Sequence, residues 1–420
     1  MKENEWAICL PGTFARLAPH TGALHELLQA YNDGRLLKEP SYICTSSVAA
    51  IPATIAAHRS EEKFQEIEKM LLTLKKRHFA GIHPQLKNRA SIDFAAIVGF
   101  IFATHQIGRI DNPWIRNLLL LSLIYPAYQI TKKTIKDIFT VEAFLTYENL
   151  EKLLMKVLDF EAIFSSPMKI EIPAVNINKA GWLLSEVLSD PPVYLHGWKN
   201  KGWVSVTNFK PEDVDMDRET RNKKYVAKLI NGLRVYGHFP PGRHENDDAI
   251  VDTAALSNLP IHFALNQGYN NIVVFYYDSA SEGPVSTHFK SWPSSLNRDF
   301  DVTISEATRK TLLGYLRVNN DLEQLRRTRE TLKEMADIAD GPHMDATARK
   351  SIRTNIDVIE ESMKNLSYAH KQRINFIFVG SDPLPAIHFG NFRNEDLAAG
   401  IERGRKAAQD VIPAINKMIS

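Results

Sequence analysis

The order of short elements at the start of the sequence constrains the fold most. Ala7–Leu10 has the apolar pattern of a buried strand and ends at Pro11-Gly12, and a helical pattern over Thr21–Ala30 follows. A second strand pattern, Ser41–Cys44, continues almost without a loop into a helical pattern over Ala49–His58. Strand, helix, strand and helix in this order predict a parallel sheet covered by helices.

The remainder of the chain extends this α/β pattern. We expect residues 60–165 to be almost entirely helical, as an insertion or lid within a first domain over residues 1–290. Residues 300–420 should add a helical hairpin over 305–370, one strand and a last helix from Glu395 to Met418, all packed on the same core. The other predicted strands are Met168–Val175, Trp203–Val206, Asn271–Tyr277 and Ile374–Val379.

The charge balance, the cysteines and the apolar stretches limit the partners and the cellular compartment that we expect for the protein. Lys and Arg number 51 against 49 Asp and Glu, so no global field holds a polyanion, which argues against a nucleic acid as the main partner. Cys9 and Cys44 lie in apolar strand patterns, as expected for buried, reduced thiols. The apolar stretches 94–104 and 115–125 are too short to span a bilayer and are expected as buried helices, with contact to a membrane surface left open. With no visible signal segment, we expect a cytoplasmic protein, and export by a signal-less route stays open.

A hydroxyl-rich turn, Thr45-Ser46-Ser47, lies between the second strand pattern and its helix. A serine at a sharp strand-to-helix turn is typical of a nucleophile elbow, because the turn exposes the hydroxyl and the helix N-terminus offers N–H groups to an oxyanion. Such an elbow needs small residues two positions to either side. Ser47 has Ala49 there, whereas Ser46 has the branched Val48, so sterics favour Ser47. An ordinary helix start with capping hydroxyls has the same pattern.

Two further segments could complete such a site. Asp252 follows Ile250 and Val251 at the end of a strand pattern, where burial would make it a stronger base than a surface carboxylate, although a turn-capping aspartate has the same pattern. The loop Gly12-Thr13-Phe14 can point N–H groups at an anion, and Arg16 is either a fixed cation or a rim residue. No Gly-Lys-Ser/Thr follows, which argues against nucleotide binding.

Together, the three segments resemble the patatin-like phospholipase family over roughly residues 5–280. In that family a loop of the form GGGxRGxxHxGxL precedes a G-x-S-x-G elbow, and an Asp-Gly-Gly or Asp-Gly-Ala motif running on to Asn-x-Pro comes later. The matching residues are Gly12, Arg16, His20, Gly22 and Leu24 in the loop, Ser47, Ala50, Ile51 and Ala53 in the elbow, and Phe239-Pro240-Pro241, Asp252, Asn258, Leu259 and Pro260 around the acid.

The resemblance implies a patatin-like α/β fold and a Ser47–Asp252 dyad that needs no histidine, metal or other cofactor. Ser47 would attack an ester carbonyl and Asp252 would accept its proton. The backbone of Gly12, Thr13 and Phe14 would hold the oxyanion, with Arg16 and Ser46 as support. The substrates would be acyl esters of lipids or other small acyl esters, and the apolar helices between 90 and 165 would form the wall or lid of the acyl pocket.

Several motif glycines of the family are replaced in this chain. The substitutes are Thr13, Phe14 and Leu17 in the loop, Thr45 and Ala49 in the elbow, and Thr253 and Ala254 after the acid. A non-glycine residue forced to positive φ costs on the order of 1–2 kcal/mol. Two interpretations therefore stay open: an active or slowed hydrolase, and a non-catalytic relative that binds lipid or a protein partner through the 305–370 hairpin.

A catalytic triad with a histidine base is the rival interpretation. In the chain order serine, aspartate, histidine, the third member could be His262, His288 or His388, but no recognisable motif surrounds any of them. His78 and His83 lack further metal-ligating residues nearby, so we expect no metal site there.

Overall fold

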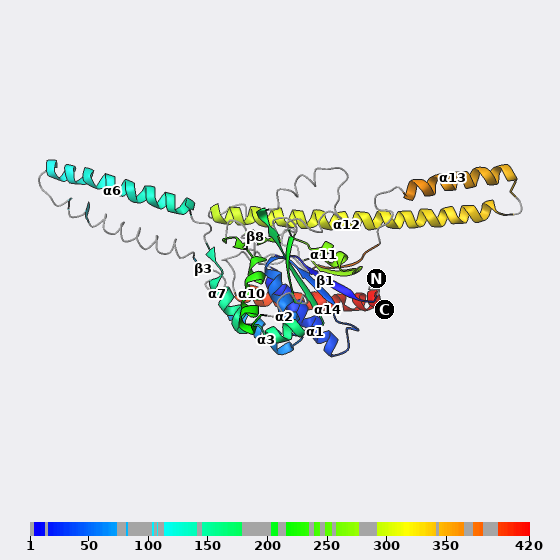
Figure 1. The fold of residues 1–420 in the computed structure, drawn as a ribbon, viewed down its shortest axis with the longest axis horizontal. Helices are drawn as coiled ribbons and strands as arrows, with labels where there is room; N and C mark the ends of the chain where they lie inside the picture. Colours follow the sequence, from blue (N-terminus) through cyan, green and yellow to red (C-terminus); the bar gives the residue numbers. More distant parts are fainter. Residues whose placement is uncertain are drawn as a thin grey trace.

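A mixed sheet forms the centre of the protein in the computed structural model (Figure 1). Among the described residues it has eight strands, in the order β10-β9-β1-β2-β5-β8-β7, with β6 paired to β5. The pairings from β10 to β5 are parallel, and β6, β7 and β8 join antiparallel, so the predicted mostly parallel α/β class is confirmed. The strands are β1 (Trp6–Leu10), β2 (Tyr42–Thr45), β5 (Lys169–Asn176), β6 (Trp203–Thr207), β7 (Gly242–Arg243), β8 (Ala249–Asp252), β9 (Asn271–Phe275) and β10 (Asn375–Val379).

The structure describes most of the chain. The described residues are 4–12, 16–73, 81–82, 103–104, 107, 113–140, 145–178, 203–208, 216–234, 239–243, 248–253, 258–276, 292–341, 344–364, 373–380 and 394–420. Thr13, Phe14, Ala254, His78, His83, His288 and His388 lie outside them, as does nearly all of the apolar stretch 94–104.

Helices flank the sheet and extend beyond it on both sides (Figure 1). Their bounds are α1 (Leu17–Asn32), α2 (Ala50–Ala56), α3 (Glu61–Thr73), α6 (Pro113–Thr140), α7 (Glu148–Val157), α8 (Phe160–Ser165), α10 (Arg218–Asn231), α11 (Ile261–Asn266), α12 (Trp292–Ala339), α13 (Ala346–Lys364) and α14 (Asn394–Ile419), with a short 3₁₀ helix η2 (Ser47–Ala49) before α2. Within the predicted helical insertion, the short strands β3 (Gly81–Ile82) and β4 (Leu145–Thr146) pair antiparallel.

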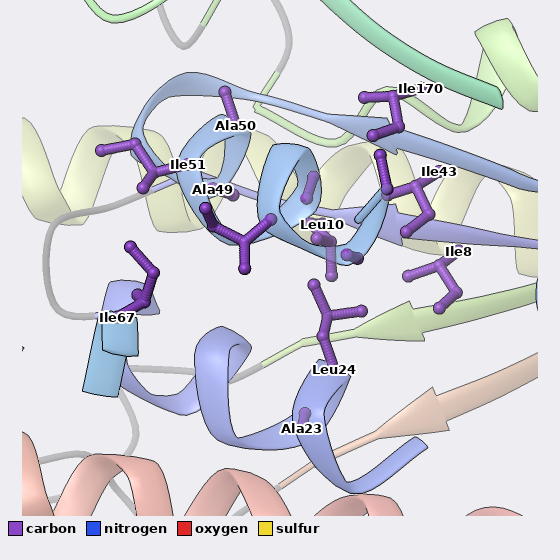
Figure 2. Packing of buried hydrophobic residues seen from close by; sticks show 14 of the residues in the cluster. Ile8, Leu10, Ala23, Leu24, Ile43, Ala49, Ala50, Ile51, Ile67 and Ile170 are labelled. Atoms are coloured by element: carbon purple, nitrogen blue, oxygen red, sulfur yellow. The ribbon is translucent and has the colours of Figure 1, made fainter. Parts of the chain in front are cut away.

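Alternate residues of the central strands pack on opposite faces of the sheet. In β1, Trp6, Ile8 and Leu10 join the core under α1, α2 and α14, whereas Ala7 and Cys9 join the core under α11 and α12. Figure 2 shows the first of these cores, where side chains of the sheet meet those of η2, α1 and α2. A strand buried on both faces has a continuous run of apolar residues, and such runs predict β1, β2 and β9 from the sequence.

Glycines allow α14 to lie against α1 at very short range. A Cβ built on Gly22 would lie 2.0 Å from the Ile401 carbonyl oxygen, and one built on Gly404 would lie 1.9 Å from the Pro19 carbonyl oxygen. Gly400 faces Ala18 and Pro19 in the same way. The last helix therefore packs against α1, and this packing accounts for the glycine at position 22.

Gly404→Ala is expected to destabilise the protein by about 3 kcal/mol or more, because the added methyl would overlap backbone that cannot move independently. Gly314→Ala is the matched control, since a Cβ at this glycine of α12 meets nothing within 4 Å. Alanine is the better helix former, so the control should unfold at an equal or higher denaturant concentration. Equal unfolding midpoints for the two variants would contradict the close packing of α1 and α14.

Three predicted features differ from the structure. Helix α1 begins at Leu17, earlier than expected. Pro19 is tolerated in the first turn, because N–H groups there have no hydrogen-bond partner within the helix and proline lacks only that group. Helix α12 begins at Trp292, before the expected start at residue 305. The apolar stretch 115–125, expected to be buried, lies on α6, which projects from the body (Figure 1). Leu118 of this stretch is 71% exposed.

Candidate functional site

The chain makes a strained turn at Ser47. Strand β2 ends at Thr45, Ser46 is still extended at φ −121° and ψ 144°, and Ser47 then adopts φ +54° at the start of η2. Among the described non-glycine residues, only Ser47 and Arg59 have positive φ. This conformation costs a non-glycine residue about 1–2 kcal/mol and is typical of functional turns. Of the two candidate hydroxyls, Ser47 therefore has the backbone geometry of a nucleophile elbow.

Strand pairing brings Asp252 to the position at which β2 leaves the sheet. On one edge of β5, Cys44 of β2 pairs with Glu171, so a continued strand would place Ser47 opposite Ala174. Ala174 pairs instead with Asp252, the last residue of β8. Because β6 occupies the other edge of β5 over the same residues, β2 and β8 meet end to end along a single edge. The turn at Ser47 and the carboxylate-bearing end of β8 thus converge.

A hydrogen bond between side chains joins the two strand ends. The hydroxyl groups of Ser46 and Thr253 lie 2.5 Å apart, and both residues are fully buried. The Thr253 hydroxyl also lies 3.4 Å from Asp252 Oδ1. Thr253 therefore links the serine turn to the acid. Sequence reasoning missed this role, because no pattern pairs Ser46 with a residue 207 positions away.

Gly12 allows the first loop to approach the serine turn. A Cβ at Gly12 would lie 2.3 Å from the Ser46 carbonyl oxygen and 2.4 Å from Ser47 Cβ, so only glycine fits. The Gly12 N–H donates to Asn258 Oδ1 at 2.9 Å, and Asn258 Nδ2 donates to Thr308 Oγ1 of α12 at 3.1 Å. Asn258 thereby ties the loop after β1 to α12. The motif-like Gly12 and Asn258 are direct partners.

Three described residues that depart from the resembled motifs, Thr45, Ala49 and Thr253, have no strained backbone. Ala49 has φ −63°, and neither Thr45 nor Thr253 is among the described residues with positive φ. The cost anticipated from sequence for these three substitutions is therefore absent. The strain resides instead at Ser47.

Arg16 and His20 lie inside the protein behind the loop. Arg16 is fully buried, which excludes the rim alternative, and its guanidinium lies 5.6 Å from the centre of the Tyr276 ring. His20 Nε2 donates to the Pro11 carbonyl oxygen at 2.9 Å and so holds the bend before Gly12. Burial lowers the pKa of His20 from 6.5 to about 3, with a smaller contribution from Arg16, so the ring stays neutral.

His20 should make the protein acid-sensitive. Its folded-state pKa is about 3 against 6.5 unfolded, so between these pH values the unfolded chain binds a proton that the folded chain does not. Stability therefore falls as the pH falls through this window, by about 2 kcal/mol from this group at pH 5. His20→Gln, which can donate the same bond without titrating, should flatten the dependence of the urea midpoint on pH between 8 and 5. An unchanged slope would contradict this assignment.

Aromatic side chains line the structure around Asp252. Tyr147 stacks on Phe239, with ring centres 3.7 Å apart, and its hydroxyl donates to the Leu233 carbonyl oxygen. Burial, reinforced by the negative charge of Asp252, raises the pKa of Tyr147 well above its usual range. The Asp252 N–H donates to the Arg234 carbonyl oxygen at 2.9 Å. Phe239 of the Phe-Pro-Pro segment thus packs on a tyrosine that is close enough to Asp252 to be affected by its charge.

Other nucleophile and base candidates are poorly suited. Burial raises the pKa of the Cys9 and Cys44 thiols well above the ordinary range, so both are inert, and both are free as predicted. Burial lowers the pKa of His262 to about 4, which makes it a weak base.

The comparisons with known proteins show distant likeness to solved structures and nothing in the sequence searches. No family model and no curated protein matches the sequence. Among solved structures, the chain is similar to VipD from Legionella pneumophila, with a TM-score of 0.37 and 12% identity, over 98% of this chain and 67% of that one. The case for function therefore stands on the geometry of the chain itself.

Proposed function

We propose that the protein is a patatin-like serine acyl hydrolase that cleaves lipid acyl esters with a Ser47–Asp252 dyad. The supporting observation is the convergence on one edge of β5, where Asp252 takes the position that Ser47 would occupy if β2 continued. A hydroxyl on a left-handed turn and a buried carboxylate at the end of the adjoining strand are the two groups that nucleophilic catalysis requires.

In the proposed reaction, Ser47 Oγ attacks the ester carbonyl carbon while Asp252 accepts the hydroxyl proton. The tetrahedral oxyanion is held by N–H groups of Thr13, Phe14 and the start of η2. Gly12 acts mainly by its close approach, since its own N–H already donates to Asn258. Collapse breaks the ester C–O bond, and the leaving alcohol takes the proton from Asp252. Water, deprotonated by Asp252, then releases the fatty acid and restores Ser47.

Fatty-acid release from phospholipid and lysophospholipid micelles tests the proposal. The parent protein should release fatty acid, and Ser47→Ala should lower the rate by about 10³-fold or more. Ser46→Ala is the matched control. The Ser46 hydroxyl is engaged by Thr253 and is not the proposed nucleophile, so this variant should retain most of the activity. Loss of activity in Ser46→Ala with retention in Ser47→Ala would show that the nucleophile is Ser46.

The alternative is a non-catalytic patatin-like scaffold. The low exposure of Ser47, 5% of the residue, favours it, since a nucleophile has to be accessible to its substrate. No fatty-acid release from any ester, by a parent protein with a normal unfolding transition, would support the scaffold.

A further inference from the structure

Helix α6 projects from the body of the protein (Figure 1). It carries a stripe of exposed apolar side chains. The stripe consists of Trp114, Leu118, Leu121, Tyr125 and Tyr128, which are 86%, 71%, 63%, 69% and 57% exposed. Their spacing of four, three, four and three residues places them on one face of the helix. Side chains of this size in one continuous row indicate an interaction surface.

The charge on α6 has one predominant sign. The helix contains Arg116, Lys132, Lys133 and Lys136 against a single acid, Asp137, which gives four positive charges and one negative. Lys132 and Lys133 are exposed, and Lys132 occupies the next position of the same 4-3 row after Tyr128. The apolar row therefore ends in a basic group.

This combination fits the surface of an anionic lipid bilayer. Tryptophan and tyrosine favour the boundary between water and lipid, and lysines near it are attracted to anionic headgroups by about 1 kcal/mol each. Within the described residues, no helix is both long enough and apolar enough to cross a membrane. We propose that α6 lies in the interface of an anionic bilayer with its stripe toward the acyl chains.

A 4-3 row is also the seam of a coiled coil, so a second copy of the chain is the competing occupant. Two α6 helices would bring like charges together, and their seam would contain Trp and two Tyr in place of the branched aliphatic residues that such seams favour. Charge and composition therefore favour the bilayer. The bilayer contact rests on the proposed function in one respect: a hydrolase of lipid esters has to reach a membrane to find its substrate.

Vesicle flotation with the full chain carrying Ser47→Ala tests the proposal without interference from hydrolysis. The protein should float with phosphatidylcholine–phosphatidylserine vesicles and much less with phosphatidylcholine alone. Leu118→Ser/Leu121→Ser should weaken binding by about tenfold or more. Lys132→Glu/Lys133→Glu should weaken it by about tenfold and remove its salt dependence. Ile338→Ser/Val358→Ser, which changes equally exposed side chains on α12 and α13, should bind like its parent.

Three outcomes would overturn the proposal: no flotation, flotation unaffected by both α6 variants, or oligomers in solution that Leu118→Ser/Leu121→Ser dissociates. The last would assign the stripe to a second copy. Flotation as expected, together with no fatty-acid release by the parent with Ser47 intact, would refute the hydrolase while leaving the bilayer contact standing.

Discussion

Asp252→Asn is expected to lower ester hydrolysis by about 10²–10⁴-fold, because an amide cannot accept the proton of the attacking hydroxyl. The side chain keeps its size, and the Asp252 backbone N–H still donates to the Arg234 carbonyl oxygen, so the fold should persist. The measurement is kcat/KM on a short soluble ester, together with the urea unfolding midpoint.

Asp248→Asn is the matched control for this change. Asp248 precedes β8 and accepts a hydrogen bond from Asn176 Nδ2 at 2.7 Å, away from the serine turn. Its activity should stay close to that of the parent. If both variants kept parental activity, Asp252 would not be the base. If both lost activity equally, the loss would come from a disturbance of strand β8 and not from removal of the Asp252 carboxylate.

Gly12→Ala is expected to abolish activity and to destabilise the protein by roughly 3 kcal/mol or more. The new methyl would lie 2.3 Å from the Ser46 carbonyl oxygen and 2.4 Å from Ser47 Cβ, so either the loop or the serine turn must move. Movement of the loop would also break the 2.9 Å bond from the Gly12 N–H to Asn258.

Gly380→Ala serves as the control for Gly12→Ala, because a Cβ at Gly380 meets nothing within 4 Å. Its activity and unfolding midpoint should remain near those of the parent. Parental activity in Gly12→Ala would show that the loop does not have to contact the serine turn for catalysis.

The strands and helices of the core were predictable because their patterns are local. Both faces of β1, β2 and β9 are buried, so each strand is marked by an unbroken apolar run. The position of α6 was not predictable in this way. An apolar run such as 115–125 has the same composition whether it packs in a core or projects into solvent, and only the tertiary structure distinguishes the two.

The sequence predicts candidate residues for the site but not how they are connected. Comparing Ala49 with Val48 favours Ser47, and the left-handed turn at Ser47 is compatible with that choice. The register that brings Asp252 opposite Ala174 depends on antiparallel pairing between β5 and β8, which are distant in sequence. The contacts of Thr253 with Ser46 and of Asn258 with Gly12 follow from that register, so no local pattern could indicate them.

Site mapping of a fluorophosphonate adduct tests the proposed nucleophile most directly. The small electrophile should modify the native protein once, and peptide mass spectrometry should place the adduct on Ser47. The adduct should be absent from Ser47→Ala and from urea-unfolded protein, and its formation should slow sharply in Asp252→Asn. An adduct on another residue, or a labelling rate indifferent to Asp252→Asn, would contradict the Ser47–Asp252 dyad.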